Sequence, residues 1–190
     1  HDGGERGVDR REMLGMRKDA LGPIPVTRLQ RRPHEPGRPR RIVEQEAGVQ
    51  IGLVGLGSMG RNHVRVVAGH PETLLAAVAD TDPDAVAAVG AQTGAAGFTD
   101  PLAMIAETEL DGMIIAAPTT VHSPLAHAAI ARGVPVLVEK PLAATYAEAL
   151  AIVAAGRAAG VPVQVGHVER YNPAVLRLGQ LLREGWLTSI

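Results

Sequence analysis

Short apolar runs alternate with longer, Ala-rich stretches over most of the chain. The apolar runs fall at residues 49–54, 74–79, 112–117, 134–138 and 161–165, with a shorter one near 97–99. They are almost wholly apolar, which is typical of parallel strands covered on both faces. The stretches between them predict helices over 58–69, 83–92, 101–107, 123–132 and 145–159. This alternation predicts an α/β fold with a doubly wound parallel sheet.

Helix boundaries carry their own local signals. Pro83 and Pro101 each follow an aspartate, a pattern that predicts an N-cap with proline in the first turn. Three glycines stand where predicted helices should end: Gly69, Gly133 and Gly160. A last helix is predicted over Pro173–Glu184, and the following residues, 185–190, resemble the first strand of a further unit.

Residues 1–47 have a different composition. They are Pro-rich and carry a basic cluster at 28–41. Dense prolines block helix and central strand, and few apolar residues can offset the entropy of ordering. We expect a disordered leader; a nucleic-acid-binding arm and a piece of an upstream domain are the alternatives. Because the chain begins with His1 rather than Met, we expect a fragment or a processed product.

Composition then removes several classes of function. The net charge is −1 and 46% of the residues are hydrophobic, which gives no electrostatic reason to expect nucleic acid or an anionic membrane as partner. No apolar run reaches the roughly 18–20 residues of a membrane span. The absence of cysteine excludes disulfides and fits the cytoplasm. The histidines do not cluster with carboxylates, so no metal site is expected, and we expect His63 and His70 to face solvent.

The first chemical motif is a GxGxxG turn between the first strand and the first helix. Gly55 permits a tight turn, Gly57 lets phosphates approach the backbone, and Gly60 lets the helix pack close to the sheet. The helix directs its N-terminal N–H groups at the phosphates. The motif therefore predicts a dinucleotide seat in a Rossmann domain, a purely structural turn being the alternative. The expected cofactor contacts are Gly55, Gly57, Ser58, Met59 and Gly60.

Asp80 stands twenty residues after Gly60, at the end of the second predicted strand. A carboxylate there can accept hydrogen bonds from the adenosine ribose and would repel a 2′-phosphate, so NAD is favoured over NADP. Capping of the turn before Pro83 is the alternative role.

Three further motifs follow later strands. They are Ala-Ala-Pro-Thr-Thr-Val-His at 116–122, Val-Glu-Lys-Pro at 138–141 and Val-Gly-His-Val-Glu-Arg-Tyr-Asn-Pro at 165–173. The carboxyl ends of parallel strands lie at the edge where ligands bind, so we expect these polar groups in the crevice rather than in the core. The alternatives without ligand contact are a surface role for Lys140, a salt bridge for Glu139, a helix cap for His122 and a loop role for His167.

Together these motifs resemble the glucose–fructose oxidoreductase / inositol dehydrogenase family (Gfo/Idh/MocA), from Val49 to Ile190. The segment from Gly166 to Pro173 looks most like members that oxidise nucleotide-linked sugars, such as UDP-N-acetylglucosamine-type 3-dehydrogenases. The resemblance implies an NAD-dependent oxidoreductase that takes a hydride from a secondary hydroxyl of a sugar or cyclitol. A Rossmann module that binds NAD(H) without chemistry is the alternative function.

The resemblance also implies roles for single residues. Lys140 would be catalytic, contacting the substrate hydroxyl and assisting proton transfer, while Glu139 and Pro141 hold its loop, with a cis Lys140–Pro141 bond. Further cofactor contacts would come from Pro118, Thr119, His122 and Glu139. Substrate contacts would come from Lys140, His167, Arg170, Tyr171 and Asn172.

Domain limits follow from the same resemblance. Residues 48–170 are expected to form the NAD(P)-binding domain, and 171–190 to begin the family's C-terminal α/β substrate domain. The family's catalytic histidine, its neighbouring aspartate and the oligomer interface belong to that second domain. We therefore expect a homo-oligomer with a small-molecule substrate at full length, and cofactor binding without turnover for this piece.

Overall fold

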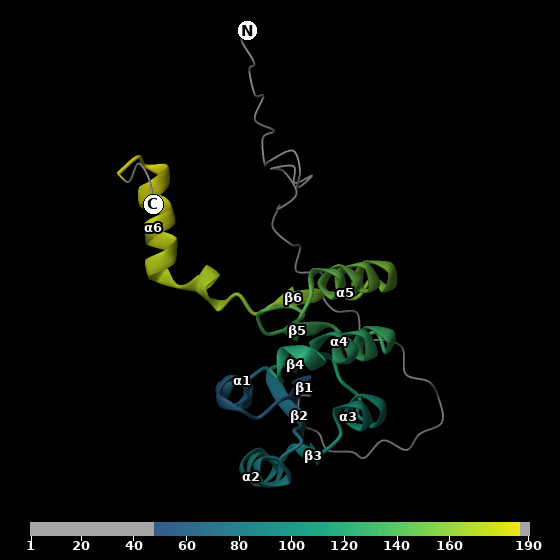
Figure 1. Cartoon of the computed structure of the whole chain (residues 1–190). Coiled ribbons are helices and arrows are strands. Elements are labelled where there is room, and N and C mark those ends of the chain that lie inside the picture. The colour runs from purple at the N-terminus through teal and green to yellow at the C-terminus, as the bar shows by residue number, and fades with distance from the viewer. Residues whose placement is uncertain (1–47, 187–190) are drawn as a thin grey trace. The chain divides into compact units, whose positions relative to one another are not determined.

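Six parallel strands form one sheet in the order β3-β2-β1-β4-β5-β6 (Figure 1). The structure, a computed structural model, describes residues 48–186, so the predicted leader 1–47 and residues 187–190 lie outside it. This strand order is the one found in doubly wound dinucleotide-binding domains, and it confirms the predicted fold class. The strands are β1 (Val49–Val54), β2 (Thr73–Ala79), β3 (Ala96–Phe98), β4 (Gly112–Ile115), β5 (Val136–Val138) and β6 (Val163–Val165).

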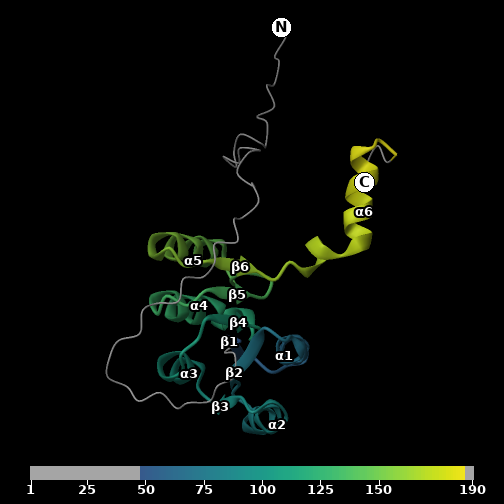
Figure 2. The same cartoon turned by 180° about the vertical axis from the view of Figure 1, so that it is seen from behind.

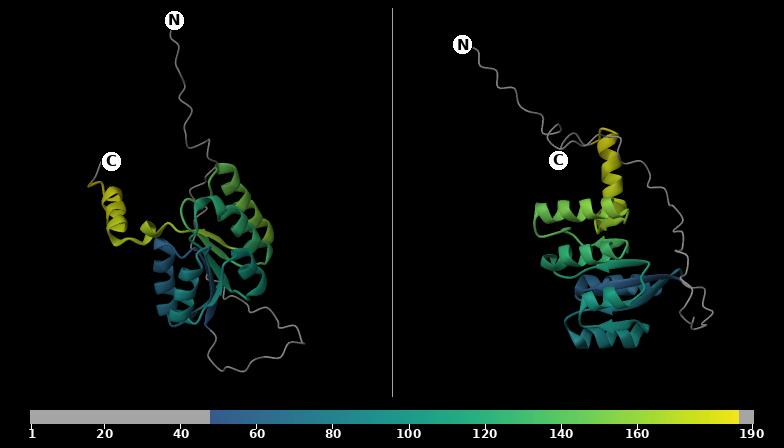
Figure 3. Two further views of the ribbon diagram at one scale, coloured as in Figure 1. Left: turned by 60° about the horizontal axis from the view of Figure 1, so that its bottom comes forward. Right: turned by 90° about the vertical axis from the view of Figure 1, so that its right-hand side faces the viewer.

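Helices cover both faces of the sheet, as the views in Figures 2 and 3 show. The helices are α1 (Ser58–Gly69), α2 (Pro83–Thr93), α3 (Pro101–Glu107), α4 (His122–Ala131), α5 (Tyr146–Ala159) and α6 (Pro173–Arg183), with 3₁₀ turns η2 (Thr119–Val121) and η3 (Val168–Tyr171). Helices α1 and α2 pack on one face, and α3, α4 and α5 on the other. Among the described residues, no helix combines the length and apolar character needed to cross a bilayer.

Alternation along the strands divides the interior into two cores. In β1, Leu53 joins the cluster beneath α1 and α2, while Val54 joins the cluster beneath the other three helices. In β2, Val78 and Ala79 divide in the same way. Successive side chains of a strand point to opposite faces, so a nearly continuous apolar run is what a doubly covered sheet requires.

Strands β4, β5 and β6 are shorter than predicted, and for β5 and β6 the difference has a local cause. Val134 and Val161 are buried, but their N–H groups donate to Ala129 and Gly156, carbonyls in the last turns of α4 and α5. They therefore end helices rather than begin strands. An apolar run reports burial, and burial extends beyond the residues that form ladder hydrogen bonds.

The two predicted Asp-Pro caps are confirmed, and two further helices carry side-chain caps. The Asp82 side chain accepts from Asp84 N and Ala85 N, and the Asp100 side chain accepts from Leu102 N. Thr145 caps α5 through a capping box with Glu148, and Asn172 caps α6. Helices α1 and α4 differ, because no side chain caps them; Gly57 stands at the N-cap of α1.

Candidate functional site

Two glycines of the turn after β1 are required by close contacts with the backbone. Gly55 has φ +91°, and a Cβ there would lie 2.6 Å from the Ala116 carbonyl carbon and oxygen. A Cβ at Gly60 would overlap the carbonyl oxygen of Gly55. Both positions therefore need glycine for the fold itself: Gly55 lets β1 turn beside the loop after β4, and Gly60 lets α1 start against that turn.

Gly57 is different, because a Cβ there would meet nothing within 4 Å. It is exposed, and so are its neighbours Ser58 and Met59. The open space lies directly before the first turn of α1, whose N–H groups have no helical acceptors and no side-chain cap. Backbone donors beside an unobstructed glycine form a seat that suits an anionic group such as a pyrophosphate.

Asp80 ties the end of β2 to this turn. Its Oδ2 accepts a hydrogen bond from Leu56 N at 2.6 Å, and its Oδ1 accepts one from Asp82 N at 3.0 Å. The alternative role of Asp80, capping the turn before Pro83, is thus present in the structure. Each carboxylate oxygen keeps a second lone pair, so the same group is able to accept from a ribose hydroxyl; that contact stays a prediction.

The loop after β4 reaches the same edge of the sheet. Pro118 is exposed and Thr119 half-buried at the start of η2. Behind them lies His122, only 1% exposed, with Nε2 2.8 Å from Ala117 O and Nδ1 3.0 Å from Pro141 O. Both partners are carbonyl oxygens, so the ring N–H groups are the donors in these contacts. His122 therefore joins the loops after β4 and β5. Its side chain is buried rather than open to the crevice as expected, and its contact with the cofactor stays a prediction.

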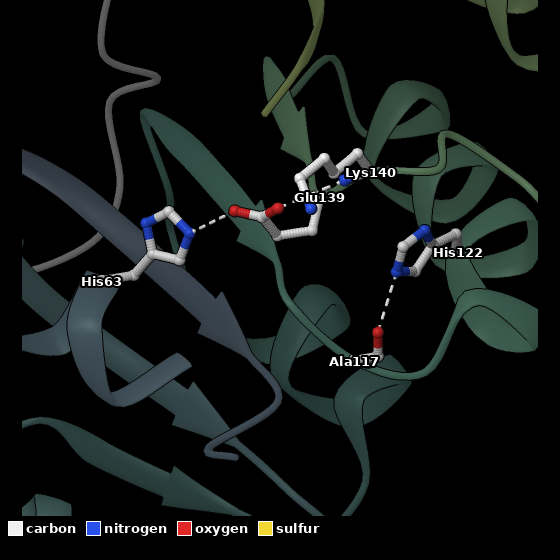
Figure 4. A network of polar contacts seen from close by, with 5 residues as sticks. All are labelled: His63, Ala117, His122, Glu139 and Lys140. Carbon is white, nitrogen blue, oxygen red and sulfur yellow. Dashed lines mark hydrogen bonds and ion pairs between the residues drawn. The ribbon is translucent and has the colours of Figure 1, made fainter. Parts of the chain in front are cut away.

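Glu139 is also buried, contrary to the same expectation (Figure 4). Its side chain lies between two elements that are far apart in sequence. Oε1 is 2.8 Å from His63 Nε2 on α1, and Oε2 accepts from Lys140 N at 3.2 Å. The geometry thus supports the alternative role of Glu139 as an ion-pair partner, here of His63. Direct contact with a cofactor remains a prediction.

His63 does not face solvent as expected; its side chain is 17% exposed against Glu139. The helical period could have revealed this position. Gly60, Val64 and Val67 are the buried residues of α1, and His63 lies three residues after the first and four before the last. It borders the inward stripe, whereas His70, beyond the helix end, is exposed as expected.

Lys140 is exposed at the end of β5, next to the cis Lys140–Pro141 bond that the family resemblance implied. The remaining predicted substrate residues follow β6. His167, Arg170 and Tyr171 are exposed, and within residues 48–186 none of them forms a hydrogen bond or ion pair with Lys140. Asn172 caps α6 and donates to Glu169 at 2.7 Å, so its side chain is already engaged.

No group of three or more metal-ligating side chains gathers anywhere within the part of the chain that the structure describes.

Comparisons with known proteins agree with this geometry. A family model described as "Oxidoreductase family, NAD-binding Rossmann fold" (GFO_IDH_MocA) matches residues 49–167. Inositol 2-dehydrogenase 1 of Saccharopolyspora erythraea is 38% identical over 72% of this chain and 42% of its own length. D-apiose dehydrogenase of Paraburkholderia graminis is 34% identical over 70% of this chain and 36% of its own length.

A solved structure shows the same arrangement. The WlbA dehydrogenase of Bordetella pertussis, in complex with NADH and UDP-GlcNAcA, superposes with a TM-score of 0.69 at 30% identity, covering 74% of this chain and 41% of that one. The chain thus spans less than half the length of the relatives it matches.

Proposed function

The chain belongs to the Gfo/Idh/MocA family of oxidoreductases with an NAD-binding Rossmann fold, and from this premise we propose that the protein is an NAD-dependent dehydrogenase of a secondary hydroxyl group in a sugar or cyclitol. The observation that carries the proposal is the edge of the sheet where the open Gly57 turn, Asp80 and Lys140 follow β1, β2 and β5. Open doubly wound sheets bind ligands at this edge.

Each residue at this edge of the sheet has a proposed role. The turn at Gly57 and the first turn of α1 would hold the pyrophosphate, and Asp80 the adenosine ribose. Pro118 and Thr119 would border the nicotinamide, which when bound supplies the hydride acceptor. Lys140, with its amine unprotonated, would accept the hydroxyl proton at Nζ, since its side chain is exposed at the same edge.

Two substrate classes have support. Inositol 2-dehydrogenases are among the relatives of highest identity, at up to 40%, which favours a cyclitol. The likeness to WlbA bound to UDP-GlcNAcA favours a nucleotide-linked sugar. His167, Arg170 and Tyr171 are exposed after β6 and would contact either substrate. We further propose that the full-length protein is a cytoplasmic homo-oligomer.

The test uses the full-length protein and a panel of inositols, D-apiose and UDP-sugars, with NADH formation followed by absorbance. We expect turnover with one class. Lys140→Met should abolish it while NADH affinity, measured by fluorescence, stays unchanged, because the lysine acts on the hydroxyl and not on the phosphates. No NAD reduction with any substrate of the panel would overturn the proposal.

A second candidate, NAD(H) binding without chemistry, is favoured by one observation. Residues 48–186 hold the whole glycine turn and Asp80, yet the chain spans only 42% of a related dehydrogenase. Calorimetric titration of the full-length protein with NADH, beside the same turnover assay, separates the two: heat of binding without turnover by the full-length protein supports the second candidate.

A further inference from the structure

Glu139 and His122 are the two polar side chains that are buried among the described residues. Burying a carboxylate is costly unless it is paired and hydrogen-bonded. For Glu139 the partners are His63 Nε2 at 2.8 Å and Lys140 N at 3.2 Å. The proposed reaction uses neither His63 nor the Glu139 carboxylate directly, so their pairing needs another explanation.

The lack of a side chain at Gly166 leaves room for the Glu139 carboxylate. A Cβ at Gly166 would lie 3.0 Å from Glu139 Cδ and Oε1 and 3.1 Å from Oε2. The backbone there is tied to β5, since Gly166 N donates to Val138 O. Three elements therefore meet on one side chain: α1 through His63, the end of β5 through Glu139 itself, and the end of β6 through Gly166.

The peptide that carries Lys140 is held from its other side as well. His122 contacts the carbonyl oxygen of Pro141, the residue after Lys140. His63 acts on the N-terminal side of Lys140 through Glu139 (Figure 4). His122 acts on the C-terminal side through Pro141. The His122 contact lies within the β4–β5 side of the sheet, whereas the His63 contact reaches across to α1.

We propose that His63 is a positioning residue: by holding the Glu139 carboxylate against the Lys140 N–H, it fixes the Lys140 backbone relative to α1. Helix α1 is the same helix whose first turn would hold the pyrophosphate. One rigid element thus sets the places of both the cofactor seat and the proton acceptor, which matters because small misplacements in an active site cost large factors in rate. The catalytic meaning rests on the proposed function, while the link itself is a property of the cofactor-free chain.

The test follows the Lys140 amide by nitrogen-15 NMR in the 190-residue chain without cofactor. In His63→Leu the carboxylate loses its side-chain partner and turns toward solvent, releasing the Lys140 N–H. We expect a shifted resonance and hydrogen exchange about tenfold faster or more, the size of a lost hydrogen bond to a charged group. His63→Gln, which keeps an N–H donor, should restore most of the protection. His70→Leu, at the exposed histidine just after α1, is the matched control.

A Lys140 amide unchanged in folded His63→Leu, or a His63→Gln amide that behaves like the leucine variant, would overturn the inference. If His63→Leu does not fold, Gly166→Ala replaces it, because its methyl group displaces only the flexible end of Glu139. It should move the Lys140 amide in the same way, and an unmoved amide overturns the link. Failure of the wild-type chain and the full-length protein to bind NADH, with the amide coupling intact, would instead count against the proposed function alone.

Discussion

At the scale of single residues, the three glycines of the turn after β1 have separable roles. Gly55 and Gly60 face backbone atoms that leave no room for a Cβ, so they serve folding. Gly57 faces open space and has an extended backbone, φ −66° and ψ −162°, that other residues can adopt. The chain therefore keeps glycine at this position for a reason that lies outside its own packing, and a bound phosphate is the proposed one.

This separation predicts the effect of Gly57→Val. We expect NADH affinity to fall at least about 100-fold, as steric exclusion of the phosphates removes several charge-assisted hydrogen bonds of about 1.5–3 kcal/mol each. The midpoint of thermal unfolding without cofactor should stay near that of wild type. Calorimetric titration and a melting curve measure the two effects.

Gly69→Val is the control, since Gly69 also faces open space but ends α1 at the opposite pole from the turn. It should leave NADH affinity unchanged. Equal loss of affinity in both variants, or none in Gly57→Val, would contradict a phosphate seat at Gly57.

Residues with local partners could be predicted from the sequence, and those with distant partners could not. The Asp82 and Asp100 caps bond to N–H groups two or three residues away, so a short pattern suffices. His63 and Glu139 are separated by 76 positions, and their contact exists only after β1, α1 and β5 are assembled. The motifs placed Glu139 at the correct edge but gave no sign that its carboxylate turns inward.

At the scale of elements, the Asp-Pro signal located helix starts, since α2 and α3 begin at Pro83 and Pro101 as predicted. Helices α1 and α3 begin and end where predicted, at 58–69 and 101–107. Strands β5 and β6 begin two residues later than predicted, because valines that complete the preceding helix are as apolar as strand residues. Hydrophobicity alone does not distinguish a buried helix end from a strand start.

The capping box of α5 supports an element-scale prediction. Thr145 Oγ1 accepts from Glu148 N at 3.2 Å, and the Glu148 carboxylate accepts from Thr145 N at 3.0 Å. Thr145→Ala removes half of this pair and should lower the free energy of unfolding by about 1 kcal/mol. Thr81→Ala, at an exposed threonine outside the helices, should change it by less than about 0.5 kcal/mol. Urea unfolding of both variants checks the difference, and equal effects would contradict it.

The two faces of α5 give a second prediction at this scale. Ile152 is fully buried in the core cluster beneath α3, α4 and α5, whereas Leu150 on the same helix is 51% exposed. Ile152→Ala should cost about 2–5 kcal/mol, combining lost transfer energy with a cavity. Leu150→Ala should cost less than about 1 kcal/mol. Comparable losses in the two urea curves would show that α5 packs differently.

At the scale of the whole molecule, the strand order decides where the chemistry lies. The chain moves outward from β1 to β3 and then crosses back to β4, so the loops after β1 and β4 diverge to opposite faces and leave a crevice. The fold class followed from the alternation of apolar runs. The assignment to NAD chemistry needed the glycine spacing in addition, because many doubly wound sheets share the alternation alone.

Ligand binding should therefore be visible in global stability. A ligand at about 100 times its Kd stabilises the native state by about 2.7 kcal/mol. For a domain of this size that corresponds to a rise of roughly 5–10 °C in the midpoint of thermal unfolding with NADH. NADPH at the same concentration should give a smaller rise, since Asp80 would repel its 2′-phosphate. A larger rise with NADPH would contradict the role given to Asp80.

The missing side-chain cap of α1 has one more consequence. Helices α2, α3, α5 and α6 carry side-chain acceptors at their N-termini, whereas α1, like α4, begins without one. In the empty molecule, this turn is where fraying starts at least cost. A phosphate oxygen bound there would supply the acceptor that the sequence omits, so a nucleotide would add hydrogen bonds to the first turn of α1.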